Sequence, residues 1–221
     1  MIPPRSPFSS SSDDIIDVVA KEKPAGTDSD SPLPETPLNE TPLTDTNPTP
    51  PRLDMQFMLR HPAHWFALGF GSGLSGVAPG TFGTIWAWVA FTVLSPHLGD
   101  SGWSWVIGLS LPLGWWACAV TARHVNRLDP SCVVWDEVVA FWLVLWLVTP
   151  ASFSQQFAAF ALFRFFDAVK PGPVGWADRL FHAVDPQTDR RAWSKAGLGI
   201  MLDDLVAAGC TVLVIALWRF L

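Results

Sequence analysis

Several familiar catalytic and structural signatures are missing from this chain, and each absence narrows what it does. Its three cysteines, Cys118, Cys132 and Cys210, form no CxxC pair and have no histidine at metal-binding spacing. Their odd number argues against a disulfide framework, so we expect reduced thiols used as small apolar residues. The chain also has no GxSxG, HExxH or Cys-x5-Arg motif and no Gly-Lys-Ser/Thr phosphate loop. These absences argue against the common serine, zinc and cysteine chemistries and against a P-loop nucleotide site.

Residues 1–54 lack tryptophan and hold 11 of the 20 prolines, with ten acidic and four basic residues. Such a segment cannot bury enough apolar surface to offset chain entropy, so we predict a disordered tail. It shows no basic stretch followed by a long apolar run, and we expect no secretory signal in it. Residues 55–221 then form one domain with ten acidic and ten basic residues, for which we expect no nucleic-acid partner.

Five strongly apolar runs occupy the domain, over residues 82–95, 103–121, 133–149, 154–169 and 204–221. Each is at or just below the length of about 20 residues that a membrane-spanning helix needs. Tryptophans lie near many of the run ends, as in an interfacial belt. Residues 138–148 of the third run are apolar all round, which suits a lipid-facing helix better than an amphipathic one. The pattern predicts an all-α integral membrane helical bundle with about four to five membrane helices.

The connections between the runs differ in charge, and this difference predicts an orientation. Residues 96–102 and 150–153 contain no lysine or arginine, whereas residues 122–132 and 170–202 contain several. By the positive-inside rule, the N-terminus and the two basic connections lie in the cytoplasm. The protein is then a multi-pass membrane protein.

Five acidic residues stand in or beside the last three runs, all at the predicted cytoplasmic edge. Asp136 and Glu137 open the third run, Asp167 lies near the end of the fourth, and Asp203 and Asp204 open the fifth. Carboxylates beside lipid-grade sequence are costly, and Mg²⁺ prefers oxygen ligands of this kind. The alternative is helix capping, because acids are favoured in the first turn of a helix. Their common edge favours a divalent-cation site.

Two basic residues accompany Asp167 in the stretch Arg164-Phe-Phe-Asp-Ala-Val-Lys170. Arg164 and Asp167 share a helix face, so a purely structural ion pair is the alternative. An acid that holds a cation, flanked by an arginine and a lysine, suits a metal-bound phosphate.

A glycine-rich stretch over residues 69–84 precedes the first run directly. Its Gly80-Thr81 turn could offer backbone N–H groups to a phosphate at a helix N-terminus. Close helix packing through small residues explains the same composition equally well.

Taken together in this order, the motifs resemble the bacterial phosphatidylglycerophosphatase A family over about residues 60–218. The stretches that carry the resemblance are GFGSGLSGVAPGTFGT (69–84), VVWDE (133–137), FRFFDAVKPGP (163–173), ADR (177–179) and GLGIMLDDLVAAG (197–209). The resemblance implies a Mg²⁺-dependent lipid phosphatase that is a multi-pass protein of the bacterial inner (plasma) membrane, with its active site facing the cytoplasm. Such an enzyme removes the terminal phosphate of phosphatidylglycerophosphate, a membrane lipid, to give phosphatidylglycerol.

The residues and the resemblance lead to one hypothesis for the site. The five acids named above hold Mg²⁺ at the cytoplasmic edge, while Arg164, Lys170 and the Gly80-Thr81 turn bind the phosphate. Asp136, Asp167, Arg164 and Lys170 carry the catalysis. The alternatives from other classes are a lipid-headgroup phosphotransferase, a cation transporter and a non-catalytic membrane scaffold. Nothing in the pattern fixes the oligomeric state.

Overall fold

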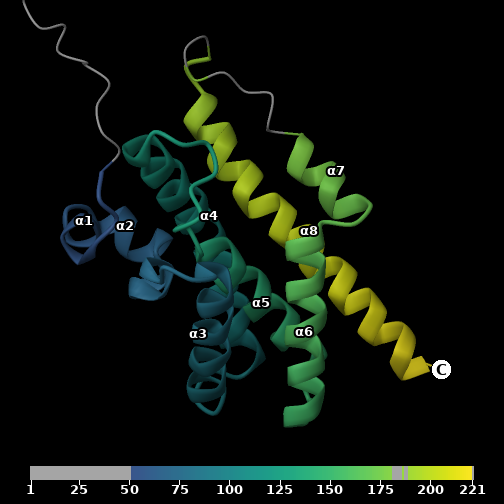
Figure 1. Cartoon of the computed structure of the whole chain (residues 1–221). Helices are drawn as coiled ribbons and strands as arrows, with labels where there is room; N and C mark the ends of the chain where they lie inside the picture. Colours follow the sequence, from purple (N-terminus) through teal and green to yellow (C-terminus); the bar gives the residue numbers. More distant parts are fainter. Residues whose placement is uncertain (1–50, 181–185, 187–188, 221) are drawn as a thin grey trace, which may run out of the picture. The chain divides into compact units, whose positions relative to one another are not determined.

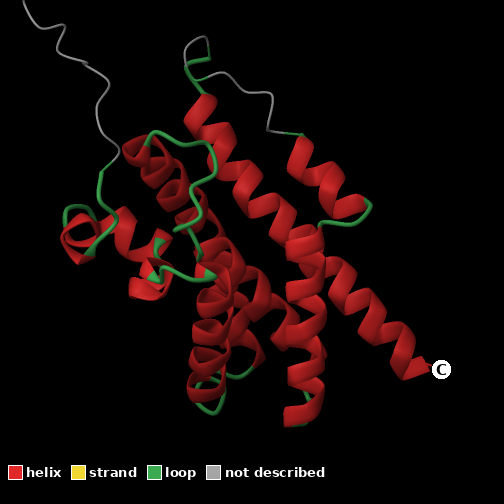
Figure 2. Cartoon of the chain, in the orientation of Figure 1, coloured by secondary structure: helices red, strands yellow, loops and turns green. Residues whose placement is uncertain are grey.

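The structure, a computed structural model, describes residues 51–180, 186 and 189–220, and this part of the chain contains helices and no strand (Figure 2). The prediction of an all-α fold is therefore confirmed. The elements in chain order are α1 Met55–Leu59, α2 Pro62–Ala67, the 3-10 helix η1 Gly69–Leu74, α3 Pro79–Leu94, α4 Asp100–Val125, α5 Trp135–Val148, α6 Phe153–Val169, α7 Pro173–Arg179 and α8 Ala192–Phe220. Of the predicted tail, residues 1–50 lie outside the described residues.

The five long helices α3, α4, α5, α6 and α8 run alternately up and down, with α5 between the others (Figure 1). α5 packs against α3, α4, α6 and α8, and ten of its 14 residues are buried. The interpretation of residues 138–148 as lipid-facing is therefore wrong. A helix that is apolar all round suits a protein core as well as lipid, and here neighbouring helices cover most of it, with Leu147 exposed by 52%.

Two helices, α4 and α8, are long and apolar enough to cross a membrane by length and composition. α3, α5 and α6 have 16, 14 and 17 residues, so each is roughly 21–26 Å long, against about 30 Å for the hydrocarbon core. The count of four to five membrane helices stays a prediction.

The fifth apolar run proves to be only the second half of a longer helix. α8 begins at Ala192, so Asp203 and Asp204 lie in its interior rather than in its first turn. Helix capping therefore does not explain this acidic pair. Asp136 and Glu137 do lie in the first turn of α5, but the N-terminus of that helix has no side-chain cap.

The short N-terminal helices are fastened to the end of α4 by histidines. Asp54 caps α1 by accepting a hydrogen bond of 2.8 Å from the Phe57 amide. His64 on α2 bonds the Phe57 carbonyl through Nδ1 at 2.8 Å, and its Nε2 lies 2.8 Å from Nδ1 of His124. The histidine pair thus joins α1 and α2 to the last turn of α4.

Candidate active site

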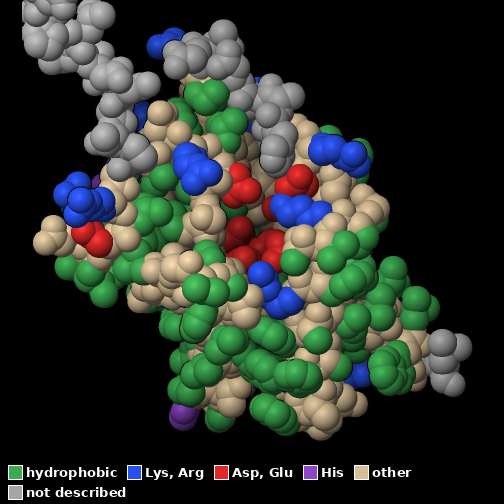
Figure 3. Space-filling view, viewed as in Figure 1, with side chains coloured by type: hydrophobic (Ala, Val, Ile, Leu, Met, Phe, Trp, Pro, Cys, Tyr) green, Lys and Arg blue, Asp and Glu red, His purple; other side chains and the backbone are tan. Residues whose placement is uncertain are grey.

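A cavity of about 330 Å³ opens where α3 and α5 begin, where α6 ends and where α8 is at mid-length. Figure 3 shows it as a hollow in which acidic side chains gather, with basic side chains at its edges. Its lining includes six carboxylates, those of Asp129, Asp136, Glu137, Asp167, Asp203 and Asp204. The prediction that the five acids lie close together is confirmed by this arrangement.

Three of the carboxylates are close enough to share one ion. Glu137, Asp167 and Asp204 each offer an oxygen atom, and these oxygens lie within 4.8 Å of one another. They come from three helices: the first turn of α5, the last turn of α6 and the interior of α8. The arrangement is the one expected for oxygen ligands of a divalent cation.

Several carboxylate oxygens in this cavity are buried without a hydrogen-bond partner among the described residues. They are Asp136 Oδ1, Glu137 Oε2, Asp203 Oδ1 and Asp204 Oδ2. A buried polar atom without a partner is costly, and a buried anion more so. A cation bound among these oxygens would remove that cost, so the donor set fits a metal ion such as Mg²⁺.

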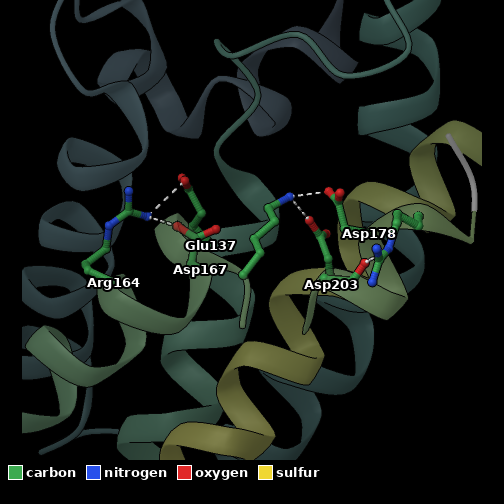
Figure 4. Close-up of polar contacts among 8 residues, drawn as sticks. Glu137, Arg164, Asp167, Asp178 and Asp203 are labelled. Carbon is green, nitrogen blue, oxygen red and sulfur yellow. Dashed lines mark hydrogen bonds and ion pairs between the residues drawn. The ribbon is translucent and has the colours of Figure 1, made fainter. Parts of the chain in front are cut away.

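Arg164 links two of the acids that come from different helices. Its Nη1 donates to Glu137 Oε1 at 3.1 Å and also to Asp167 (Figure 4). The ion pair between Arg164 and Asp167 that the sequence suggested is therefore present. Its extension to α5 makes it part of the cavity wall, so the pair is more than a local contact on α6.

Lys170 makes a second ionic bridge, on the other side of the cavity. It ends α6 with φ 47°, a left-handed conformation that turns the chain toward α7. Its Nζ donates to Asp203 at 2.5 Å and to Asp178 on α7 (Figure 4). Burial acts to lower the pKa of Lys170, but its hydrogen bonds to Asp178 and Asp203 outweigh burial and raise it. Lys170 is therefore a fixed positive charge at neutral pH.

Gly80 brings the start of α3 against the acids. A Cβ atom at this position would overlap the Glu137 carboxylate, so only glycine allows the approach. Gly80 borders the cavity, whereas Thr81 does not. The Thr81 amide donates to the Ala78 carbonyl at 3.0 Å. Close packing through small residues thus accounts for Gly80, and its predicted role in phosphate binding stays a prediction, as does that of Thr81.

Two acids of the site were not among the predicted site residues. Asp178 pairs with Lys170, and Asp129 lines the cavity from the connection between α4 and α5. Asp178 belongs to the Ala-Asp-Arg stretch that contributed to the family resemblance, and this was a usable signal. Asp129 follows Leu128 in a short polar connection, where nothing in the sequence distinguishes it from a surface residue.

Comparison with known proteins gives a consistent result. The model of the family "PgpA: Phosphatidylglycerophosphatase A" matches residues 65–219. A phosphatidylglycerophosphatase A of Escherichia coli K12 is 35% identical over 149 residues, covering 67% of this chain and 78% of the relative. A phosphatidylglycerophosphatase A of Haemophilus influenzae is 36% identical over 157 residues, covering 71% and 88%. A protein of Bacteroides thetaiotaomicron named "Putative phosphatidylinositol-3-phosphatase" is 34% identical over 161 residues, covering 69% and 90%. No solved structure matches the chain.

Proposed function

This chain belongs to the phosphatidylglycerophosphatase A family, and we propose that it hydrolyses phosphatidylglycerophosphate to phosphatidylglycerol and phosphate. The observation that carries the proposal is the cavity in which buried carboxylates from three helices meet Arg164 and Lys170. Anionic ligands for a cation, beside two fixed positive charges, form a site for a phosphate that arrives with its metal ion. In a cation transporter, the positive charges of Arg164 and Lys170 would repel the transported ion.

The metal ligands are proposed from the same geometry. Glu137, Asp167 and Asp204 would hold Mg²⁺, and Asp136 and Asp203 lie beside them in the cavity. When bound, Mg²⁺ would polarise the phosphate and lower the pKa of a coordinated water.

The chain's own side chains would do the rest of the work. Arg164 and Lys170 would pair with the phosphate oxygens and favour the loose transition state of phosphoryl transfer. Asp136, whose buried Oδ1 has no partner among the described residues, would take a proton from the attacking water. The bond between phosphorus and the glycerol oxygen breaks, the hydroxyl stays on phosphorus, and Asp136 returns its proton to the glycerol oxygen.

The membrane setting follows from the helices and the charges. α4 and α8 would cross a bacterial inner membrane together with the shorter helices of the bundle. Basic residues are concentrated near the cavity, including Arg123 in the last turn of α4, Arg127 in the connection after it and Lys195 in the first turn of α8. By the positive-inside rule the cavity faces the cytoplasm, so the headgroup would be cleaved on that side.

The test measures phosphate release by the purified protein in detergent micelles. Wild type with Mg²⁺ should release phosphate from phosphatidylglycerophosphate, and a chelator should stop it until Mg²⁺ is restored. Asp167→Asn should lower kcat/KM by roughly 100-fold or more, because a ligand charge is lost. Asp189→Asn is the matched control, since Asp189 lies outside the cavity, where it pairs with Lys195 at 2.6 Å and accepts from the Arg191 amide at 2.8 Å.

Two results would contradict the proposal. Full activity in chelator would show that the reaction needs no metal ion. If Asp167→Asn is as active as the Asp189→Asn control, the cavity is not the active site. Phosphatidylinositol 3-phosphate is the comparison substrate suggested by the third relative's name. A higher kcat/KM on that lipid would reassign the substrate while leaving the chemistry unchanged.

A further inference from the structure

The surface between α3 and α6 leads from the cavity along the length of both helices without a charge. No Asp, Glu, Lys or Arg occurs in Pro79–Leu94 or between Phe153 and Phe163. Figure 3 shows the boundary: below the hollow with its acidic and basic side chains, the surface over α3 and α6 carries mainly hydrophobic side chains. The first ionic group along α6 is Arg164, at the edge of the cavity.

One row of α6 side chains runs up to that arginine. Phe153, Phe157, Phe160 and Arg164 follow each other at steps of four, three and four residues, which places them on one helix face. Phe153 and Phe157 are exposed, by 75% and 56%. From Phe153 to Arg164 the row rises about 16 Å. One leaflet of a bilayer core is about 15 Å deep, so the row matches the depth over which a lipid is purely hydrocarbon.

α3 contributes the other side of this surface. α3 packs on α5, and α6 packs on α8 and α5. α3 and α6 therefore meet each other mainly through long side chains. The Trp88 ring lies 5.3 Å from that of Phe153 and 5.7 Å from that of Phe160, and its Nε1 donates to Gln156 at 2.7 Å. Beside this bridge an apolar recess of about 330 Å³ is lined by Trp88, Phe153 and three further α3 residues.

The exposed α3 residues continue toward the cavity. Ile85 and Val89, one turn apart, are 43% and 58% exposed, and Gly80 of the same helix borders the cavity itself. The surface of α3 and α6 is thus apolar up to the cavity edge, where the positive charge of Arg164 begins. A phospholipid has the same order of parts, from acyl chains to a phosphate-bearing headgroup.

We propose that the surface formed by Ile85, Trp88 and Val89 of α3 and by Phe153, Phe157 and Phe160 of α6 holds the acyl chains of the lipid substrate. The inference rests on the proposed function and adds the route: the substrate enters sideways from the bilayer, and its terminal phosphate enters the cavity past Arg164. Binding of the acyl chains then lowers KM for the lipid, while the cavity residues bind and cleave its terminal phosphate.

The test compares two substrates that carry the same terminal phosphate. One is dioleoyl phosphatidylglycerophosphate in mixed micelles, and the other is its water-soluble deacylated headgroup. Phe157→Ala should lower kcat/KM for the dioleoyl lipid about 5-fold through KM, equivalent to roughly 1 kcal/mol. It should leave kcat/KM for the deacylated headgroup unchanged.

Phe165→Ala is the matched control on the same helix. Phe165 is 52% exposed, and Phe157 is 56% exposed. The Phe165 ring contacts Phe166 rather than Trp88, and Phe165 lies roughly 80° around the helix from Phe157 and 100° from Arg164. It should change neither substrate's kcat/KM. Ile85→Ala tests the α3 side of the surface and should also lower kcat/KM for the dioleoyl lipid alone. It replaces Phe157→Ala if that variant does not accumulate in membranes.

Cross-linking gives a readout that does not depend on turnover. Phosphatidylglycerophosphate with a photoreactive group in mid-chain should label peptides of α3 and α6, and excess unlabelled substrate should suppress this labelling. Equal, uncompeted labelling of α4 and α8 would overturn the inference. Equal effects of Phe157→Ala and Phe165→Ala on kcat/KM would also overturn it. If Phe157→Ala changes the oligomeric mass and leaves kcat/KM for the dioleoyl lipid unchanged, the surface is instead an interface with a second copy of the chain.

The outcome also separates the two proposals. Wild type that releases phosphate from neither substrate would contradict the proposed function. Wild type that hydrolyses both, with row variants that lower both rates equally, would contradict only the acyl-chain surface.

Discussion

Gly80→Ala is the sharpest test of the site, because one methyl group meets a proposed metal ligand. An ideal Cβ at Gly80 would lie 2.7 Å from Cδ and 3.0 Å from Oε2 of Glu137, and would overlap Oε1. Carbon atoms in contact normally lie about 3.5–4.0 Å apart. The Glu137 carboxylate must therefore shift by about 1 Å from its place among the oxygens of Asp167 and Asp204.

A displacement of this size should affect activity far more than stability. A misplacement of about 1 Å in a catalytic arrangement costs on the order of 100-fold in rate, and we expect that loss in kcat/KM. The displaced atoms are at the end of a rotatable side chain, so the helices need not move. Replacing a helical glycine by alanine also favours folding by about 0.5–1 kcal/mol. We expect the free energy of unfolding to change by no more than about 1 kcal/mol, which is about 2–4 °C in Tm.

The assay is phosphate release with varied Mg²⁺, alongside thermal unfolding in the same detergent. Gly76→Ala is the control, since a Cβ there meets nothing within 4 Å, and it should behave as wild type. Glu137→Asp shortens the acid by one methylene, so the double variant Gly80→Ala/Glu137→Asp should lose less than the product of the single losses. Wild-type kcat/KM in Gly80→Ala, or a Tm drop of ten degrees or more, would refute the reasoning.

Two further predictions concern groups around the site and the N-terminal helices. Asp178→Asn should raise KM for the lipid about 3–10-fold with kcat nearly unchanged, because Lys170 loses one of its two ion pairs. Asp178→Glu should restore KM. Equal KM values for wild type and Asp178→Asn in steady-state assays would exclude this role. Burial is the main cause that lowers the pKa of His64, which faces His124, His61 and Arg60. Its contribution to stability should be complete above about pH 6.5 and fall as the pH drops below that value; Tm measured from pH 5 to 8 should show this slope in wild type and a flatter one in His64→Gln.

The sequence predicted the site best where spacing alone determines geometry. Arg164 and Asp167 are three residues apart on one helix, so their ion pair could be predicted before the fold was known. The grouping of the acids at one end followed from the alternation of the runs. Which acids would share an ion could not be predicted in the same way, because that depends on how α5, α6 and α8 turn about their axes.

The start of α8 shows where apolar runs mislead. Residues 192–203 mix polar and apolar residues, so hydropathy marks only the part of the helix that follows. The first part is helical because it packs on α4 and α7. A Cβ at Gly197 would lie 2.8 Å from the Ala119 amide nitrogen and 2.8 Å from the Trp115 carbonyl oxygen, so the two backbones approach closely there. Tertiary packing of this kind is not encoded in local composition.

The position of Asp203 and Asp204 within α8 also sets their depth relative to the bilayer. About 17 Å of helix precedes the pair and about 24 Å follows it. In the proposed orientation the following part spans most of the hydrocarbon core, which is about 30 Å thick, and this places the acids near the cytoplasmic edge of the core, next to the lipid headgroups. For the proposed substrate, the monoester phosphate lies one glycerol further out than the phosphodiester beside the acyl esters. The enzyme would then discriminate between the two phosphates of one lipid by their depth in the membrane. The diester would not be cleaved, because it lies deeper than the acids of the cavity.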